Sequence, residues 1–217
     1  VSEQFGIAPD RVAVVPGGVR VEEFEVPIER IEAARVRYGI PENYFIHIGT
    51  LEPRKNLVRL IEAHARVPGT CPPLVLAGGR GWMDAPVFEA IERQAPGRVL
   101  PLGYIPREDA VALLRGARAC LYPSLYEGFG LPVLEAMAAG TPVLTSRVSA
   151  MPEVAGDTAL LVDPTDTDAL AAGIQTLLDN PDAAQTRARA AMERAHSFTW
   201  ERAAAALADA YRRTGQT

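Results

Sequence analysis

Residues 124–140 read SLYEGFGLPVLEAMAAG, and the rest of the chain can be organised around this stretch. The apolar run Ala119-Cys120-Leu121-Tyr122 precedes it and is typical of a buried strand, whereas apolar residues recur at helical spacing from Gly130 to Ala139. The loop between them therefore joins a strand to a helix. Its glycines would let the backbone approach a ligand closely, and Pro132 suits a first helical turn, where its missing N–H costs little.

Two acidic residues flank this loop. The start of the helix would present free amides and the positive end of the helix dipole, which together favour an anion such as a phosphate. Glu127 lies on the loop and Glu135 lies more than one turn inside the helix. Taken singly, each acid fits a solvated side chain beside a tight turn equally well.

The whole phrase resembles a known signature. Glu127-Gly128-Phe129-Gly130-Leu131-Pro132 followed by Glu135 is similar to the Glu-x7-Glu motif of retaining glycosyltransferases of family 4, which have the GT-B fold. The resemblance runs from about Arg11 to Tyr211 and matches the C-terminal, donor-binding half of such an enzyme. It implies one nucleotide-sugar-binding domain over residues 1–217, with the acceptor-binding N-terminal domain absent.

A second unit of strand, loop and helix carries adjacent cations. Residues 44–49 have the pattern of a buried strand, within which His47 is expected to pack, and helical spacing resumes at Leu57. Between them lie Arg54 and Lys55, the one lysine beside 21 arginines. A diphosphate suits such charges, because lysine is a mobile point charge and arginine a forked donor.

By the resemblance, the segment from Gly49 to Asn56 holds the donor's diphosphate. Many family members have an arginine directly after the strand glycine, where this chain has Thr50. That difference leaves Arg54 and Lys55 to supply the positive charge and prevents a one-to-one transfer of roles.

Other loops are expected at the same edge. Gly78 ends a strand at 74–77, and Gly103 follows a strand at 98–102, so that by the resemblance Tyr104 and Ile105 would lie beside the nucleotide base.

The N-terminal part begins with a further candidate strand. Residues 11–15 have the composition of a strand and run into Pro16-Gly17-Gly18. This turn is open to two interpretations, a loop that approaches the ligand or a plain strand-to-loop turn.

Strands and helices alternate along the whole chain, with later strands at 142–146 and 159–162 and helices at 167–180, 181–195 and 200–212. This alternation predicts an α/β fold, a Rossmann-like doubly wound parallel sheet with helices on both faces, one half of a GT-B fold. Right-handed crossovers would bring the loops that follow the strands to one crevice.

The resemblance assigns roles to these residues. Glu127, Arg54 and Lys55 are the candidate catalytic residues: Glu127 would bind sugar hydroxyls, and the two cations would stabilise the departing diphosphate. Glu135 would accept hydrogen bonds from the ribose. No cofactor or metal is expected, because the cations would take the metal's place. The remaining candidate donor-binding residues are Gly18, Gly49, Thr50, Gly78, Tyr104, Ile105, Gly128, Phe129, Gly130 and Leu131.

Composition excludes some classes of function. Hydrophobic residues make up 48% and charged residues 23% of the chain, as in a soluble globular protein. A net charge of −5 argues against general nucleic-acid binding. Cys71 and Cys120 lack metal-binding spacing and are expected to be reduced thiols. Since residues 1–4 lack a signal-peptide pattern, we expect a cytoplasmic protein, at the inner face of the membrane if the absent half binds a lipid acceptor.

Three functions remain open from the sequence. The leading one is the donor-binding half of a hexosyltransferase in polysaccharide biosynthesis, with GDP-mannose favoured over UDP-linked donors. The second is half of a nucleotide-sugar epimerase, and the third is a nucleotide-sugar-binding module without turnover. The isolated chain is expected to bind the donor and to transfer almost nothing, because half of the site is missing.

Overall fold

The computed structural model describes residues 5–214. Residues 1–4, which lack a signal-peptide pattern, lie outside this part of the chain. Six parallel strands form one sheet in the order β3-β2-β1-β4-β5-β6. Chain order reverses between β1 and β4, so the predicted Rossmann-like doubly wound sheet is confirmed. The strands are β1 (Phe45–Ile48), β2 (Leu74–Ala77), β3 (Val99–Gly103), β4 (Ala119–Tyr122), β5 (Val143–Ser146) and β6 (Leu160–Val162).

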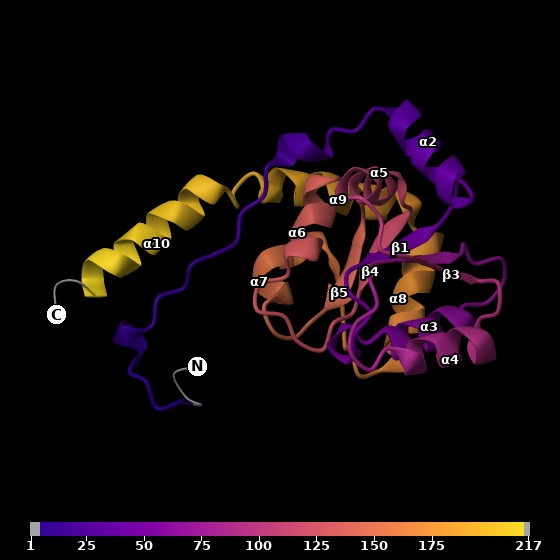
Figure 1. The fold of residues 1–217 in the computed structure, drawn as a ribbon, viewed down its shortest axis with the longest axis horizontal. Coiled ribbons are helices and arrows are strands. Elements are labelled where there is room, and N and C mark those ends of the chain that lie inside the picture. The colour runs from indigo at the N-terminus through magenta and orange to yellow at the C-terminus, as the bar shows by residue number, and fades with distance from the viewer. Residues whose placement is uncertain (1–4, 215–217) are drawn as a thin grey trace.

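Helices cover both faces of the sheet (Figure 1). Alternate strand residues serve the two layers: Ile46 and Val75 pack into one core, and Phe45 and Leu74 pack into the other. Burial on both sides explains why the strands are continuously apolar. One layer contains α2 (Ile28–Tyr38), α5 (Arg107–Gly116), α6 (Leu131–Ala138), α7 (Met151–Ala155) and much of α9 (Pro181–Ala195), and the other contains α3 (Leu57–Arg66), α4 (Ala85–Gln94) and α8 (Thr167–Asp179).

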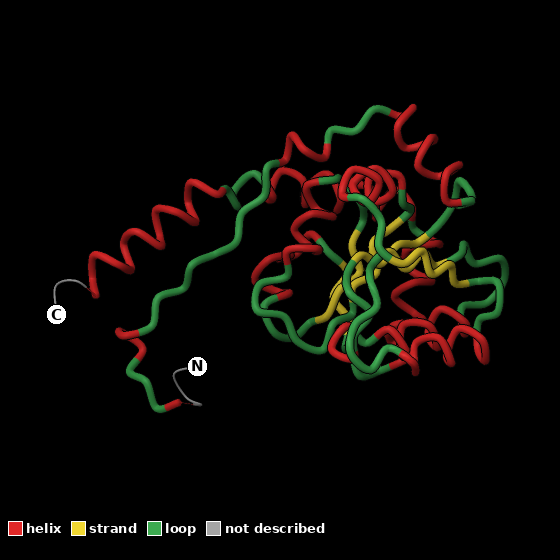
Figure 2. Tube along the Cα trace, in the orientation of Figure 1, coloured by secondary structure: helices red, strands yellow, loops and turns green. Residues whose placement is uncertain are grey.

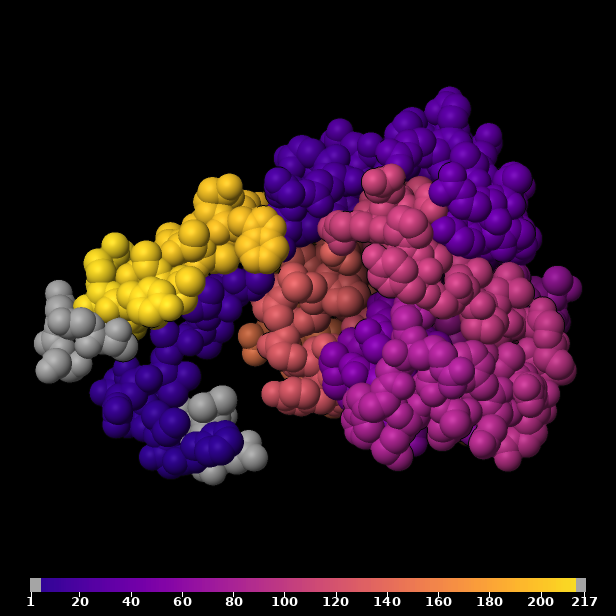
Figure 3. All heavy atoms as spheres, viewed as in Figure 1, coloured from indigo at the N-terminus to yellow at the C-terminus, as the bar shows by residue number. Residues whose placement is uncertain are grey.

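The prediction of a strand at residues 11–15 is wrong. A short 3-10 turn, η1 (Pro9–Arg11), precedes an extended segment that has no strand partner within residues 5–214, and Val14 is 81% exposed. Figures 2 and 3 show this segment leaving the body of the molecule in the same direction as helix α10 (Trp200–Thr214). β-rich composition alone does not make a strand where no neighbouring strand completes the hydrogen bonds.

The end of the chain follows the sequence prediction more closely. Thr199 caps α10, because its Oγ1 accepts a hydrogen bond from the backbone N–H of Arg202 at 3.2 Å.

Among residues 5–214, no helix has both the length and the apolarity that crossing a membrane requires.

The loops after β1 and β2 touch backbone to backbone. A Cβ atom at Gly78 would lie 2.0 Å from the carbonyl oxygen of Gly49, so the approach depends on the absence of a side chain. The backbone N–H of Gly49 also donates to the carbonyl of Ala77 at 2.9 Å. These contacts fix the first loop of the candidate site against the sheet.

Replacing this glycine tests that constraint. We expect Gly78→Ala to lower the free energy of unfolding by more than about 2 kcal/mol, because backbone must move to admit the methyl group. Gly79→Ala is the matched control, since nothing lies within 4 Å of its Cβ position. It should change stability by less than about 1 kcal/mol. Urea denaturation of both variants measures the difference; equal effects would contradict the argument.

Candidate functional site

Two predicted loops meet at the carboxyl ends of β1 and β4. These strands are parallel neighbours, so the loops that follow them leave the sheet side by side. The first loop forms a 3-10 turn, η3 (Pro53–Lys55), and its Arg54 carbonyl accepts a hydrogen bond from the N–H of Leu125 at 2.8 Å. The contact brings Arg54 and Lys55 against Glu127; the sequence predicted that the two loops would share one crevice, but it did not predict this contact.

The three side chains form an ionic cluster in which Lys55 and Glu127 are buried and the Arg54 side chain is 42% exposed. Lys55 Nζ donates to Glu127 Oε1 at 2.6 Å, and Arg54 Nη1 binds the other carboxylate oxygen. Lys55 is 5% exposed and Glu127 is 8% exposed. Arg54 Nε also pairs with Glu52 Oε1 at 2.7 Å. Two cations therefore face two carboxylates, and the charges within the cluster balance.

Sequence analysis missed Tyr122 and assigned only a packing role to His47. The Tyr122 hydroxyl accepts a hydrogen bond from Lys55 Nζ and donates to Glu127 Oε1 at 3.0 Å. The His47 ring stacks on Tyr122, with centroids 4.9 Å apart and an interplanar angle of 8°. Both residues lie toward the carboxyl ends of their strands, and a polar side chain at that place in an apolar run was the available signal.

His47 is buried, as predicted, and its tautomer follows from its contacts. Nδ1 lies 3.0 Å from the carbonyl oxygen of Leu121, which only accepts, so Nδ1 carries the proton. Nε2 is buried and has no hydrogen-bond partner among the described residues. Burial lowers the pKa of His47 to about 4, so the ring is neutral at neutral pH.

The cluster keeps Glu127 ionised. Burial alone would raise the pKa of Glu127, but hydrogen bonds from Lys55 and Arg54 outweigh it and hold the pKa below its ordinary value. Burial, together with the nearby Glu127 carboxylate, raises the pKa of the Tyr122 phenol. Glu127 is thus a hydrogen-bond acceptor for hydroxyl groups and has no proton to donate.

The glycine-rich loop connects this cluster to α6. Gly130 has φ 98° and caps α6 without a side-chain hydrogen bond, and a Cβ there would lie 2.2 Å from Met151 Cε. No atom lies within 4 Å of the Cβ position at Gly128. Ser149, another residue that sequence analysis missed, clamps Glu127: its Oγ accepts from the Glu127 N–H at 3.1 Å and donates to the Glu127 carbonyl at 2.7 Å.

A second group of predicted residues lines a small cavity of about 170 Å³. Tyr104, Ile105 and Glu135 come together there with Arg107, which sequence analysis did not identify. Arg107 Nη1 pairs with Glu135 Oε1 at 2.9 Å, and its Nη2 lies 3.3 Å from Glu23 Oε2. An arginine at the first position of a helix beside the predicted base loop was the signal for it.

The remaining predicted residues occupy different surroundings. Gly49 lies beside the ionic cluster, since a Cβ added to it would lie 3.7 Å from Lys55 Cε. Gly18 instead packs against the start of α10, where a Cβ would lie 2.6 Å from the nitrogen of Trp200. Thr50 and Leu131 are exposed, whereas Phe129 is half-buried with its ring edge-to-face against Phe198 at 6.0 Å.

Two neighbouring aspartates outside the site have structural partners. The chain has one Asp-x-Asp triplet, Asp166-Thr167-Asp168. Asp166 caps α8 by accepting hydrogen bonds from the N–H groups of Asp168 and Ala169, each at 2.9 Å, and Asp168 pairs with Arg66. Within residues 5–214, no three His, Cys, Asp or Glu side chains are grouped as metal ligands would be.

Comparison with known proteins bears on this geometry. A family profile described as "Glycosyl transferases group 1" matches residues 31–194. The O-antigen chain mannosyltransferase B of Escherichia coli is 41% identical over 175 residues, which cover 79% of this chain and 46% of that protein. A GDP-mannose-dependent alpha-(1-6)-phosphatidylinositol dimannoside mannosyltransferase of Mycobacterium tuberculosis is 35% identical over 214 residues, which cover 94% of this chain and 53% of that protein. The chain thus spans about half the length of these relatives.

A solved structure agrees with the fold. Sucrose-phosphate synthase from Thermosynechococcus elongatus superposes with a TM-score of 0.79 at 31% sequence identity. The match covers 93% of this chain and 52% of that one. The likeness therefore extends over nearly all of this chain and about half of its neighbour.

The buried His47 makes stability depend on pH. Its pKa rises from about 4 in the folded chain to 6.5 on unfolding, so between these values the unfolded chain binds an additional proton. We therefore expect His47 to remove about 3 kcal/mol of stability as pH falls from about 6.5 to about 4. Urea denaturation across this range should show a shallower pH dependence for His47→Gln than for the unchanged protein. His196→Gln alters an exposed histidine and serves as the control; parallel curves for His47→Gln would contradict the assignment.

Proposed function

Because this chain belongs to the group 1 glycosyl transferases, we propose that it is the nucleotide-sugar-binding half of a retaining, family 4 enzyme with the GT-B fold. The observation that carries the proposal is the ionic cluster of Arg54, Lys55 and Glu127 beside the uncapped start of α6. Cations, the free Leu131 N–H at the positive end of the α6 dipole and an ionised acceptor would then serve the phosphates and the sugar of one donor. Under this proposal residues 1–217 form a single domain.

Donor binding would exchange one set of anions for another. Arg54 and Lys55 hold the carboxylate of Glu127, and a diphosphate offers the same cations a stronger partner. Glu127, released in part, would accept hydrogen bonds from sugar hydroxyls, a role that its lowered pKa suits. In the transfer step the bond from the anomeric carbon to the diphosphate oxygen breaks, and a bond to the acceptor oxygen forms. The acceptor's proton leaves on the nucleoside diphosphate.

Charge develops on the diphosphate as it departs. Arg54 and Lys55 are held in place by Glu52, Glu127 and the Tyr122 hydroxyl, so they would stabilise this charge without further ordering. In this proposal the two cations do the work for which other transferases recruit a metal, and no cofactor takes part.

The small cavity would take the nucleoside. Glu135 would accept hydrogen bonds from the ribose hydroxyls, with Arg107 orienting its carboxylate, and the backbone at Tyr104 and Ile105 would lie along the base. Two relatives are named mannosyltransferases, and one is named for dependence on GDP-mannose. We therefore favour GDP-mannose as the donor, with UDP-linked hexoses as the alternative.

The acceptor would come from another domain. The chain spans about half the length of its relatives, and its N-terminal segment and α10 leave the body of the molecule together (Figure 1). We propose that an N-terminal GT-B domain supplies the acceptor site and any association with the inner face of the membrane, for a reaction of polysaccharide biosynthesis. This chain alone would bind the donor and transfer negligibly, because the reacting groups are held only from one side.

Calorimetric titration with GDP, UDP and ADP tests the donor site. We expect GDP to bind most tightly and Lys55→Ala to weaken it at least 30-fold, or about 2 kcal/mol, because a buried charge partner of the phosphate is lost. Arg66→Ala removes an exposed cation of α3 that pairs with Asp168, and should leave binding unchanged.

Lys55→Ala also leaves Glu127 without one of its partners, so each variant is first checked for cooperative unfolding. The double variant Lys55→Met with Glu127→Gln removes both charges of the pair and provides a second test. If no nucleotide binds the unchanged chain, or if the folded variants bind as well as it does, the proposal is wrong.

Replacing Arg107 tests the nucleoside cavity. Arg107→Gln should weaken GDP binding about fivefold to tenfold, because Glu135 loses the partner that orients it. Arg147→Gln is a matched control: the Arg107 and Arg147 side chains are 59% and 60% exposed, and Arg147 pairs with Asp163 away from the cavity. Equal affinities for both variants in the same titration would remove Arg107 from the proposed site.

A further inference from the structure

A second cavity lies at the opposite edge of the sheet. It has a volume of about 690 Å³. Its lining includes Arg118 and Pro142, which directly precede β4 and β5, and Asn43, two residues before β1. The proposed donor site lies at the carboxyl ends of these strands, so the length of the strands separates it from this cavity. Ligands of doubly wound folds bind at the carboxyl edge, which leaves the cavity without an assigned role.

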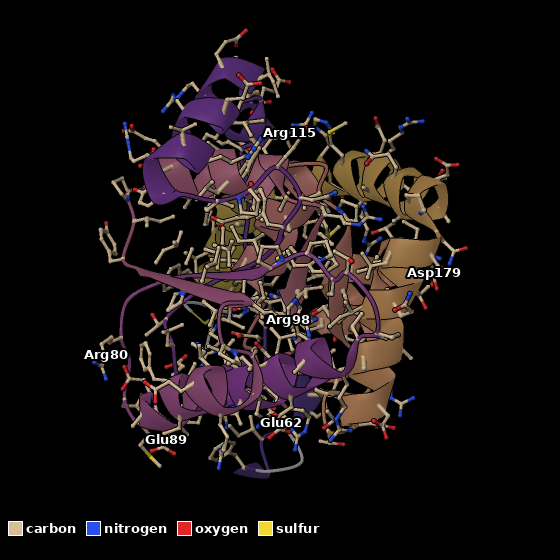
Figure 4. All side chains as sticks on the ribbon, turned by 90° about the vertical axis from the view of Figure 1, so that its right-hand side faces the viewer. Glu62, Arg80, Glu89, Arg98, Arg115 and Asp179 are labelled. Carbon is tan, nitrogen blue, oxygen red and sulfur yellow. The ribbon has the colours of Figure 1, made fainter. Side chains whose placement is uncertain are left out.

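Three arginines from separate segments line this cavity. Arg35 comes from α2, Arg115 from the end of α5, and Arg118 from the residues before β4. Figure 4 shows Arg115 close to the indigo ribbon of α2, and residues of both helices line the cavity. None of the three forms an ion pair within residues 5–214. Glu42 is the one carboxylate in the lining, so the cavity is positive in a chain of net charge −5.

Backbone carbonyls satisfy part of the hydrogen-bonding capacity of these arginines. Arg118 Nη2 donates to the carbonyl of Leu178 at 3.0 Å, Arg115 donates to the carbonyl of Ala139, and Arg35 Nε donates to the carbonyl of Pro41 at 3.2 Å. Each guanidinium has five N–H groups, so these bonds account for a minority of the donors. Arg118 Nε is buried without a hydrogen-bond partner among the described residues.

Helix α9 adds positive potential from the other side. Its first turn lines the cavity through Pro181, Ala184 and Gln185. No side chain caps this helix, because Asn180 turns its amide to the carbonyl of Thr176 instead. Pro181 has no N–H, and the Ala184 N–H donates to the carbonyl of Asn180 at 3.0 Å, so what α9 directs at the cavity is the positive end of its dipole. Exposed Asp182 in the same turn is the opposing charge.

We propose that this cavity binds a small phosphorylated compound, independently of the donor site. Guanidinium forks recognise phosphate oxygens, and the positive end of a helix dipole favours the same negative charge. The volume lies in the range of small-molecule sites and exceeds what a single phosphate would fill. The ligand class is thus an organic phosphate or diphosphate, held by Arg35, Arg115, Arg118 and the start of α9.

The test uses pyrophosphate as the probe and GDP to occupy the donor site. In ¹⁵N-labelled protein with excess GDP, pyrophosphate should shift the amide signals of residues 115–118 and 182–185 in a saturable way. The double variant Arg35→Gln with Arg115→Gln should weaken this binding at least tenfold. Arg66→Gln, an exposed arginine of α3 outside the cavity, should leave it unchanged.

Two results would overturn the proposal. One is the absence of saturable shifts at these residues up to about 10 mM pyrophosphate, and the other is undiminished binding by the folded double variant. Shifts confined to residues 49–56 and 124–131 in the absence of GDP would mean that pyrophosphate uses the donor site alone. If GDP itself fails to bind while the cavity residues still respond, the proposed function is wrong and the cavity assignment stands.

Discussion

The buried ion pair between Lys55 and Glu127 is the interaction on which the site depends. Removing two charges from water is costly, and a buried pair persists only when its remaining donors and acceptors are also satisfied. Here Tyr122 bonds to both partners, and Arg54 holds the second carboxylate oxygen. Losing Glu127 would leave Lys55 buried without a counter-charge, at a cost of about 3–5 kcal/mol, whereas losing Lys55 would leave Glu127 paired with Arg54 alone. The groups proposed to bind the donor thus also fasten the loop after β1 to the loop after β4.

The two edges of the sheet use cations differently. At the carboxyl edge, Arg54 and Lys55 face carboxylates that an incoming phosphate can replace. At the amino edge, Arg115 faces the carbonyl of Ala139, directly after α6, and Arg118 faces the carbonyl of Leu178, in the last turn of α8. These carbonyls carry only partial charges. Positive charge is therefore neutralised at the first edge and left in excess at the second. That difference follows from chain direction, because helices that follow the strands of a parallel sheet, such as α6 and α8, end at the amino edge.

Sequence pattern predicted the elements and which loops would meet, but it did not predict the contacts within the site. Apolar runs such as Ala119–Tyr122 became strands, and parallel topology brought Arg54, Lys55 and Glu127 together. The roles of His47 and Tyr122 depend on the register of β1 against β4, which pairs Phe45 with Ala119 and which no periodicity specifies. The prediction of a strand at residues 11–15 failed for a related reason, because a strand needs a neighbouring strand, which local composition does not reveal. Gly18 was predicted to lie in a loop that approaches the ligand, but in the structure its backbone packs against Trp200, where a side chain would not fit.

Charge counting explains why a donor would need more than this cluster. Arg54 and Lys55 are already balanced by Glu52 and Glu127, so a diphosphate adds negative charge that these four side chains do not compensate. The uncapped start of α6 offers partial positive charge, equivalent to about half an elementary charge. The balance must come from a rearranged Glu127 or from groups outside this chain. A transferase whose second domain supplies that charge would hold its donor more firmly once the domains close, which favours bond breaking in the complex that also holds an acceptor.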